Sequence, residues 1–139
     1  MAPTAPVFVF GTLKKGFPLH DRGLLGAEFL GKCRTVDTYP MLVAGPWFAP
    51  MMLDVVGEGL QVRGELYAVD EQRLALLDEL ESVGRPGNFR KRIQVARLEG
   101  GVVHEAYAFM KASELAKPAH TGYLEHYQDR RFIPPAQRR

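Results

Sequence analysis

Short apolar runs, each ended by glycine or proline, alternate with polar stretches along the chain. The run 6–10 is rich in β-branched and aromatic residues and stops at Gly11, which predicts a buried strand. Weaker strand patterns cover 27–37 and 41–44, and another short apolar segment follows at 51–56. Short elements with frequent turn residues favour a sheet protein over a helical bundle.

The clearest alternation of apolar and polar positions covers 60–69. One face of this predicted strand carries Leu60, Val62, Leu66 and Ala68. Gly64 interrupts that face, which predicts either a bulge or a close approach of another backbone. Two further strand patterns, 88–98 and 101–110, flank a Gly-rich connection and therefore predict a β-hairpin.

One long helix is predicted after Asp70, whose carboxylate can accept the free amide protons of a first helical turn. The apolar face of this helix is formed by Leu74, Leu76, Leu77 and Leu80. Gly84 and Pro86 end the helix near Val83. A single further helical turn is predicted over 113–117.

These elements predict an α+β domain built on a curved sheet or a small mixed β-barrel, with one main helix and short flanking helices. The 139 residues suffice for one domain with a real core, so we expect a single domain over 1–139. We expect poor order at both ends, over 1–5 and 133–139. The stretch 120–139 is polar, aromatic and basic, and its pattern predicts no element.

Composition and charge narrow the classes of function. With 46% hydrophobic and 24% charged residues, the chain is typical of a soluble globular protein, and its longest apolar runs are too short to span a membrane. The net charge of +2 is too small to indicate nucleic acid. A single cysteine excludes a disulfide framework and fits a reducing compartment, so we expect a cytoplasmic protein. We also expect a monomer.

Neither the histidines nor the basic clusters predict a site of their own. His20, His104, His120 and His126 show no metal-binding pair, so we expect no metal. Two basic clusters occur, one at 85–92 and one at 130–139, the second interleaved with aromatic residues. Such clusters could contact RNA or an acidic partner, but a solvated face is their more usual role.

Glu81 is the acidic residue of the predicted helix body that lies nearest its apolar face. It also lies in the last turn, where the helix dipole is negative. Partial burial and that dipole both raise the pKa of a carboxyl group, as a general base working near neutral pH requires. The alternative is a glutamate at the rim of the core, whose stem packs while its carboxylate stays in water.

The glycine-bounded loop 11–16 follows directly on the first predicted strand. A strand followed by such a turn is a common way to present backbone amides to an anion. Phe17 and Pro18 stand where a nucleotide-binding P-loop requires lysine and serine or threonine, so that role is excluded. The alternative is an ordinary tight turn.

The two features occur together in the γ-glutamylcyclotransferase-like (AIG2-like) family, which this chain resembles. The segment 8–16 resembles the opening strand of the family and its Tyr-Gly-Thr/Ser-Leu loop, and 64–70 resembles the central Gly-x-Leu/Val-Tyr strand. The segment 77–82 resembles the Leu-Asp-x-x-Glu helix. The similarity covers most of 7–110.

The resemblance implies a compact mixed barrel with a cavity and an enzyme that needs no cofactor. The implied substrate-binding residues are Phe10, Gly11, Thr12 and Leu13, with backbone amides at the cavity floor. Glu81 is the implied single catalytic acid/base, the residue that the helix pattern selects independently. Phe89 and Tyr39 are candidate walls of the pocket.

The implied reaction converts the γ-glutamyl group of an L-γ-glutamyl amine, such as γ-glutamyl-ε-lysine, into 5-oxoproline with release of the amine. Phe10 and Phe89 replace tyrosines of the family, and Leu19 replaces a frequent asparagine, which bears on substrate preference more than on chemistry. Two alternatives remain. One is a cyclotransferase for γ-glutamyl amino acids or glutathione, and the other is a non-catalytic ligand-binding module on the same fold.

Overall fold

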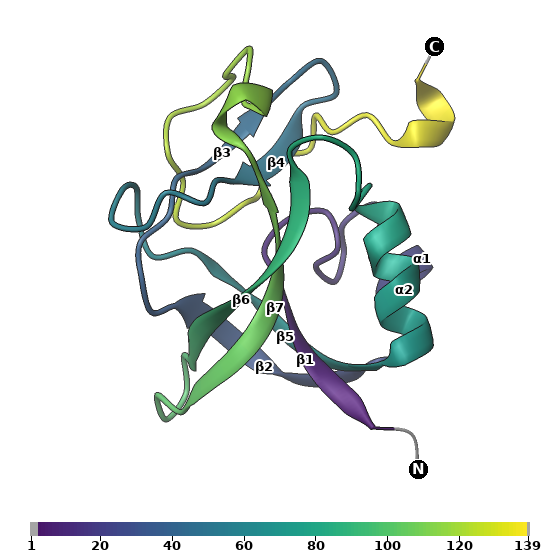
Figure 1. The fold of residues 1–139 in the computed structure, drawn as a ribbon, viewed down its shortest axis with the longest axis vertical. Coiled ribbons are helices and arrows are strands. Elements are labelled where there is room, and N and C mark those ends of the chain that lie inside the picture. The colour runs from purple at the N-terminus through teal and green to yellow at the C-terminus, as the bar shows by residue number, and fades with distance from the viewer. Residues whose placement is uncertain (1–2, 139) are drawn as a thin grey trace.

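A closed five-stranded barrel forms the centre of the computed structural model, which describes residues 3–138 (Figure 1). Around the barrel, the strands follow the order β1 (Thr4–Val9), β5 (Arg63–Asp70), β2 (Glu28–Thr35), β6 (Asn88–Arg97) and β7 (Val103–Lys111). Neighbouring strands pair antiparallel, except that β1 and β7 close the barrel in parallel. The prediction of a mixed α+β barrel is thereby confirmed.

The remaining elements surround one end and one side of the barrel (Figure 1). They are a two-stranded sheet of β3 (Met41–Ala44) and β4 (Ala49–Met52), the helices α1 (His20–Leu24) and α2 (Glu71–Leu80), and the 3₁₀ helices η1 (Ser113–Leu115) and η2 (Pro135–Gln137). The two α-helices contact each other, and α2 also contacts β5. No helix within residues 3–138 has the length and apolar character needed to cross a membrane.

Both faces of β1 are buried over residues 7–9, which explains the continuous apolar run there. Phe8 points into the barrel and packs in a core with Leu66 and Val95. Val7 and Val9 point the other way, into a second core beneath the helices. An alternating pattern is absent here because neither face of this half of the strand meets water.

The predicted strand over 60–69 is displaced, because β5 covers Arg63–Asp70 and Leu60 lies outside it, 45% exposed. Tyr67 and Val69, on the face opposite to Leu66, are also buried because the helices cover that face. Gly64 marks a close backbone approach, as one of its two predicted roles required. A Cβ atom at Gly64 would lie 2.3 Å from the carbonyl oxygen of Val9.

The predicted start of the long helix is confirmed, and its predicted end is wrong. The Oδ1 of Asp70 accepts a 2.8 Å hydrogen bond from the amide of Arg73. Leu77 is fully buried, but Leu76 is 36% exposed and does not belong to the packed face. The helix ends at Leu80 rather than near Val83, because the chain turns there to direct Glu81 toward a cavity.

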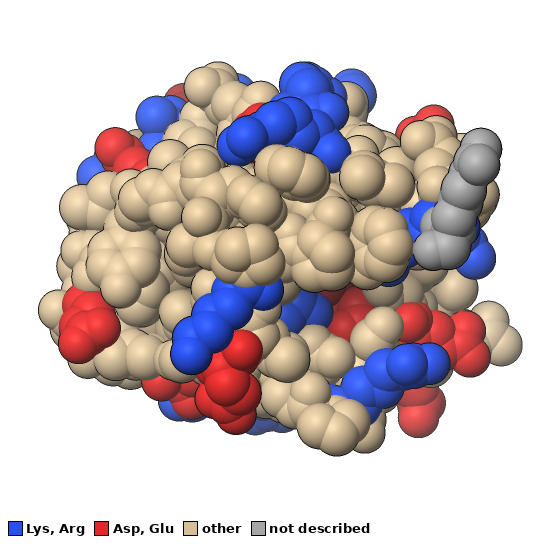
Figure 2. Space-filling view, turned by 90° about the horizontal axis from the view of Figure 1, so that it is seen from above, with Lys and Arg blue, Asp and Glu red and all other residues tan. Residues whose placement is uncertain are grey.

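The segment after η1 has little regular structure but is held along its length by backbone hydrogen bonds to distant elements. The amide of His120 donates to Val43, that of Leu124 to Met41 and that of Ile133 to Trp47. Residues 1, 2 and 139 lie outside the described residues, so expected poor order at the ends stays a prediction. On the face shown in Figure 2, basic side chains are interspersed with acidic ones.

Candidate active site

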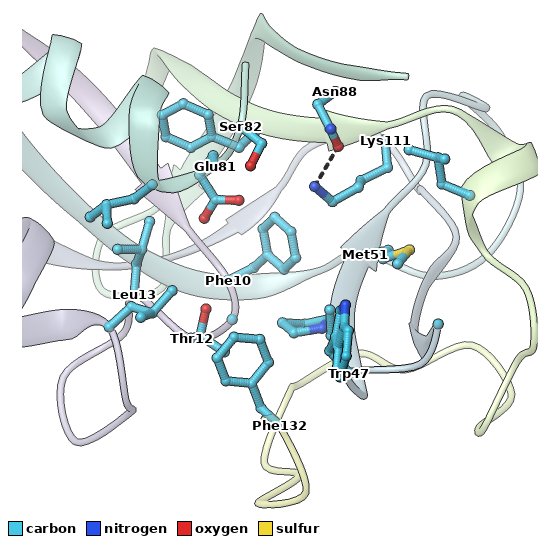
Figure 3. Close-up of a pocket in the computed structure, with 18 of the residues that line it drawn as sticks. Phe10, Thr12, Leu13, Trp47, Met51, Glu81, Ser82, Asn88, Lys111 and Phe132 are labelled. Atoms are coloured by element: carbon cyan, nitrogen blue, oxygen red, sulfur yellow. Dashed lines mark hydrogen bonds between the residues drawn. The ribbon is translucent and has the colours of Figure 1, made fainter. Parts of the chain in front are cut away.

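A cavity of about 410 Å³ lies where β1 runs into the loop 11–16 (Figure 3). Its walls come from that loop, the β3–β4 turn, the end of α2, the facing ends of β6 and β7, and the C-terminal segment. The lining includes Phe10, Gly11, Thr12, Leu13, Trp47, Pro50, Glu81, Ser82, Asn88, Lys111, Phe132 and Arg138.

The structure brings most of the predicted site residues together. Glu81 and the stretch 10–13 line the same cavity, although they are far apart in the sequence. Tyr39 and Phe89, the candidate walls, are not among its lining residues. Tyr39 is buried in the barrel core, and Phe89 packs against that same core.

The loop 11–16 is held through its carbonyl groups, which leaves its amides free. The carbonyl oxygen of Gly11 accepts from the Lys14 amide at 3.0 Å, and that of Thr12 accepts from the Leu19 amide at 3.0 Å. The carbonyl oxygen of Leu13 accepts from the Nδ1 of His20 at 2.9 Å. Among residues 3–138, no acceptor is found for the amides of residues 11–13. Three successive donors are thus available at the cavity, as an anion-binding loop requires.

Glycine is required at position 11 by the neighbouring strand. A Cβ atom there would lie 2.5 Å from the Cγ of Pro50 in β4, far inside van der Waals contact. Since a proline ring cannot swing aside, any larger residue would push the loop and β4 apart. The glycine therefore sets the distance between two walls of the cavity.

Glu81 occupies the C-cap position of α2, and a compact turn fixes it there. The amide of Ser82 donates to Glu79 at 3.1 Å, and that of Val83 donates to Asp78 at 2.9 Å. This pair of bonds forms a Schellman motif, which needs a left-handed residue directly after the cap. Ser82 supplies it with φ of 56°, and Glu81 points into the cavity (Figure 3).

We expect Ser82→Gly to raise the free energy of unfolding by roughly 0.5–1 kcal/mol. A left-handed conformation costs a residue with Cβ about 1–2 kcal/mol, and the greater freedom of glycine in the unfolded chain returns part of that gain. Denaturant unfolding measures the change. Ser82→Ala, which keeps the Cβ atom, is the control and should show no gain, and a Ser82→Gly protein less stable than wild type would contradict the strain.

The carboxylate of Glu81 is partly buried at the cavity wall. No described residue donates a hydrogen bond to it, and no ion pair is formed within 4.0 Å. Burial raises the pKa of the Glu81 carboxyl, and the ammonium group of Lys111 opposes that rise. A carboxyl group of this kind can take and return a proton near neutral pH.

Pattern analysis missed the residues that face Glu81 and the loop. Lys111 and Asn88 are cross-strand partners at the ends of β7 and β6, and the Nζ of Lys111 donates to the Oδ1 of Asn88 at 2.6 Å. Burial lowers the pKa of Lys111, and the charge of Glu81 opposes that effect. The only sequence signal was that Lys111 follows directly on an apolar run.

The C-terminal segment supplies another wall, and its arginines lie over aromatic rings. The guanidinium of Arg130 lies 4.0 Å from the ring centroid of Phe17, and that of Arg131 lies 4.8 Å from Phe48. Both are also exposed to solvent on their outer sides. Cation–π contacts of this kind hold a segment without regular structure.

The residues described contain no group of three or more His, Cys, Asp or Glu side chains that could hold a metal ion.

Comparison with known proteins identifies the family of the chain. The family model described as γ-glutamyl cyclotransferase, AIG2-like, matches residues 7–129. The γ-glutamylaminecyclotransferase of Bos taurus is 42% identical over 130 residues, which cover 88% of this chain and 75% of that protein. The γ-glutamylaminecyclotransferase C of Danio rerio is 38% identical over 133 residues, 86% of each chain.

A solved structure extends the similarity to the whole fold. The crystal structure of an AIG2-like protein from Mus musculus is 33% identical, with a TM-score of 0.85, over 98% of this chain and 99% of that one. The resemblance inferred from the motifs is thereby confirmed. The chain belongs to the AIG2-like γ-glutamyl cyclotransferase family.

Proposed function

We propose that this protein is a γ-glutamylamine cyclotransferase, which converts an L-γ-glutamyl amine into 5-oxoproline and the free amine. One observation carries the proposal: the partly buried carboxyl of Glu81, whose pKa is raised by burial, shares a small cavity with the amides of residues 11–13, which have no acceptor among residues 3–138. The names of the bovine and zebrafish relatives support the substrate class.

The reaction is a ring closure within the substrate. The α-amine attacks its own γ-carbonyl carbon, a new C–N bond closes a five-membered lactam, and the bond to the leaving amine breaks. The α-amine is mostly protonated at neutral pH, so a base must first take a proton from it. Glu81 is that base, and it passes this proton to the leaving nitrogen. The ring nitrogen gives up a second proton as the lactam forms, and the released amine takes it up, so the amine departs as an ammonium ion and no water is consumed.

The loop and the cavity supply the remaining catalysis. An amide of residues 11–13 can hold the oxyanion that develops on the γ-carbonyl, and one such donor is typically worth about 3 kcal/mol. The walls hold the substrate folded back on itself, which favours cyclisation through orientation. A volume of about 410 Å³ is in the range of sites for small molecules.

The setting of the enzyme belongs to the same proposal. We expect a cytoplasmic monomer of one domain that works without a cofactor and binds no nucleic acid. The single cysteine, Cys33, is buried in the barrel core, which suits a reducing compartment. The described acid/base group and amide donors suffice for the reaction as written.

The test is release of 5-oxoproline from γ-glutamyl-ε-lysine, with γ-glutamyl-alanine and glutathione as matched substrates. We expect the highest kcat/KM with the isopeptide. Preference for either of the other two would reassign the leaving group but keep the reaction. A folded protein that binds these compounds without turnover would instead be a ligand-binding module.

A further inference from the structure

Lys111 presents a cation to the cavity on the wall opposite Glu81 (Figure 3). The side chain is partly buried, and its position is fixed because Asn88 faces it in the β6–β7 register. An ammonium group has three protons, and the Oδ1 of Asn88 is the acceptor found for it among the described residues. Donor capacity for a ligand therefore remains.

Lys111 and Glu81 share the cavity without forming an ion pair. Their charges influence each other, yet no salt bridge within 4.0 Å joins them in the described structure. Burying opposite charges without pairing them costs free energy. A ligand that carries both charges would compensate the two groups at once.

The γ-glutamyl head group has this arrangement of charge. Its α-carbon carries a positive amine and a negative carboxylate, so one orientation places the amine at Glu81 and the carboxylate at Lys111. The reverse orientation would oppose like charges at both ends and would keep the amine away from its base. The electrostatics of the two walls therefore select the productive orientation.

We propose, resting on the function proposed above, that Lys111 is the residue that binds the α-carboxylate of the γ-glutamyl group and so presents the α-amine to Glu81. Asn88 is a positioning residue, because it holds the Nζ of Lys111. This assignment also leaves the amides of residues 11–13 free for the developing oxyanion, a role that sequence alone could not separate from carboxylate binding.

Arg138 also lines the cavity and is positively charged, but its guanidinium contacts aromatic residues of the cavity wall. Its guanidinium lies 4.9 Å from the ring centroid of Trp47 and 5.6 Å from that of Phe132. Its Nε donates to the carbonyl of Ile133 at 3.0 Å. Arg138 therefore serves the C-terminal wall, and Lys111 is the better placed of the two for the head group.

The test compares two substrates with two variants. One substrate is the γ-glutamyl amine, and the other is its analogue in which a neutral carboxamide replaces the α-carboxylate. For Lys111→Met we expect kcat/KM to fall by roughly 10- to 100-fold with the carboxylate substrate, the usual worth of a charge-assisted hydrogen bond, and to change little with the carboxamide. Lys111→Arg should recover most of the loss.

Lys91→Met is the matched control, because Lys91 is an exposed lysine of β6 that pairs with Asp54 outside the cavity. It should behave as wild type with both substrates. Equal losses with the two substrates in the Lys111→Met variant would overturn the assignment while leaving the proposed reaction intact. If that variant fails to fold, Lys111→Gln keeps a donor for Asn88 and carries the same comparison.

A binding measurement separates this inference from the proposed function. Calorimetry with 5-oxoproline and with 2-pyrrolidinone, which lacks the carboxylate, needs no turnover. Tighter binding of 5-oxoproline to wild type than to Lys111→Met supports the assignment even if the enzyme is inactive. Equal affinity of both proteins for 5-oxoproline, or no binding at all, would overturn it.

Discussion

Replacing Glu81 with glutamine is expected to lower kcat for 5-oxoproline formation by roughly 10²–10⁴-fold, the usual worth of a positioned acid/base. Glutamine has the size of glutamate but cannot accept the proton of the α-amine. The fold should be unaffected, because no described residue donates a hydrogen bond to the Glu81 carboxylate. Steady-state kinetics and the unfolding midpoint, measured on the same preparation, separate the two effects.

Glu79→Gln is the matched control, since Glu79 is an exposed carboxylate of the same helix and lies outside the cavity. It should retain wild-type kcat. A Glu81→Gln protein within about tenfold of wild type would remove Glu81 from the chemistry.

The pH profile gives a second view of the same residue. Burial raises the pKa of Glu81, and the base works only when it is deprotonated. The value of kcat/KM should therefore fall as the pH drops through a midpoint above the ordinary glutamate range. The residual activity of Glu81→Gln should lack that limb.

The second large effect concerns stability and Lys14, which is nearly buried at 3% exposure. Its Nζ donates to the carbonyl of Tyr127 at 2.7 Å and lies 4.7 Å from the ring centroid of Phe17. Burial lowers the pKa of Lys14 from 10.5 to about 8, with Glu65 opposing the shift. The lysine thus ties the loop 11–16 to the C-terminal segment at an electrostatic cost.

The sign of the pH effect follows from that depressed pKa. Between pH 8 and 10 the folded protein releases the Lys14 proton while the unfolded chain keeps it, so stability rises with pH. A full difference of one bound proton is worth about 1.4 kcal/mol per pH unit, and Lys14 is only half deprotonated at pH 8. The free energy of unfolding of wild type relative to Lys14→Met should therefore increase by about 2 kcal/mol over this window.

Denaturant unfolding at a series of pH values measures this difference, in which the titration of other groups largely cancels. Tyr127 is one such group, because burial raises its pKa to about 12. Lys15→Met, at the exposed neighbouring position, serves as the control and should show a flat difference. A flat difference for Lys14→Met as well would mean that Lys14 titrates normally in the folded state.

The sequence pattern predicted the features that depend on residues close together in the chain. Asp70 was recognisable as a cap from its own residue type, and Glu81 from its angle to the leucines of one helix. The errors arose where tertiary contacts decide burial. Leu60 and Leu76 are apolar residues left exposed, and Tyr67 is buried on the face opposite to Leu66 because helices cover that face.

The positions of Lys111 and of the C-terminal wall could not be predicted from the sequence pattern, for a different reason. Whether Lys111 faces the cavity depends on the strand register and on closure of the barrel. Neither can be predicted from a short segment of sequence. The segment around Phe132 has no periodicity, because hydrogen bonds to remote residues such as Trp47 fix its course. Helix α1 has five residues, too few for a repeat to be visible.

The parallel pairing of β1 with β7 has a consequence for how the molecule folds. Val7 and Tyr107, which pair between these two strands, are separated by 100 positions, and closing so long a loop costs entropy before any contact compensates for it. We expect slow folding, on the scale of milliseconds to seconds that is typical of barrels rich in non-local pairs. The loop amides, Glu81 and Lys111 come together only after the barrel has closed. The rate at which activity returns during refolding would therefore measure the rate of barrel closure.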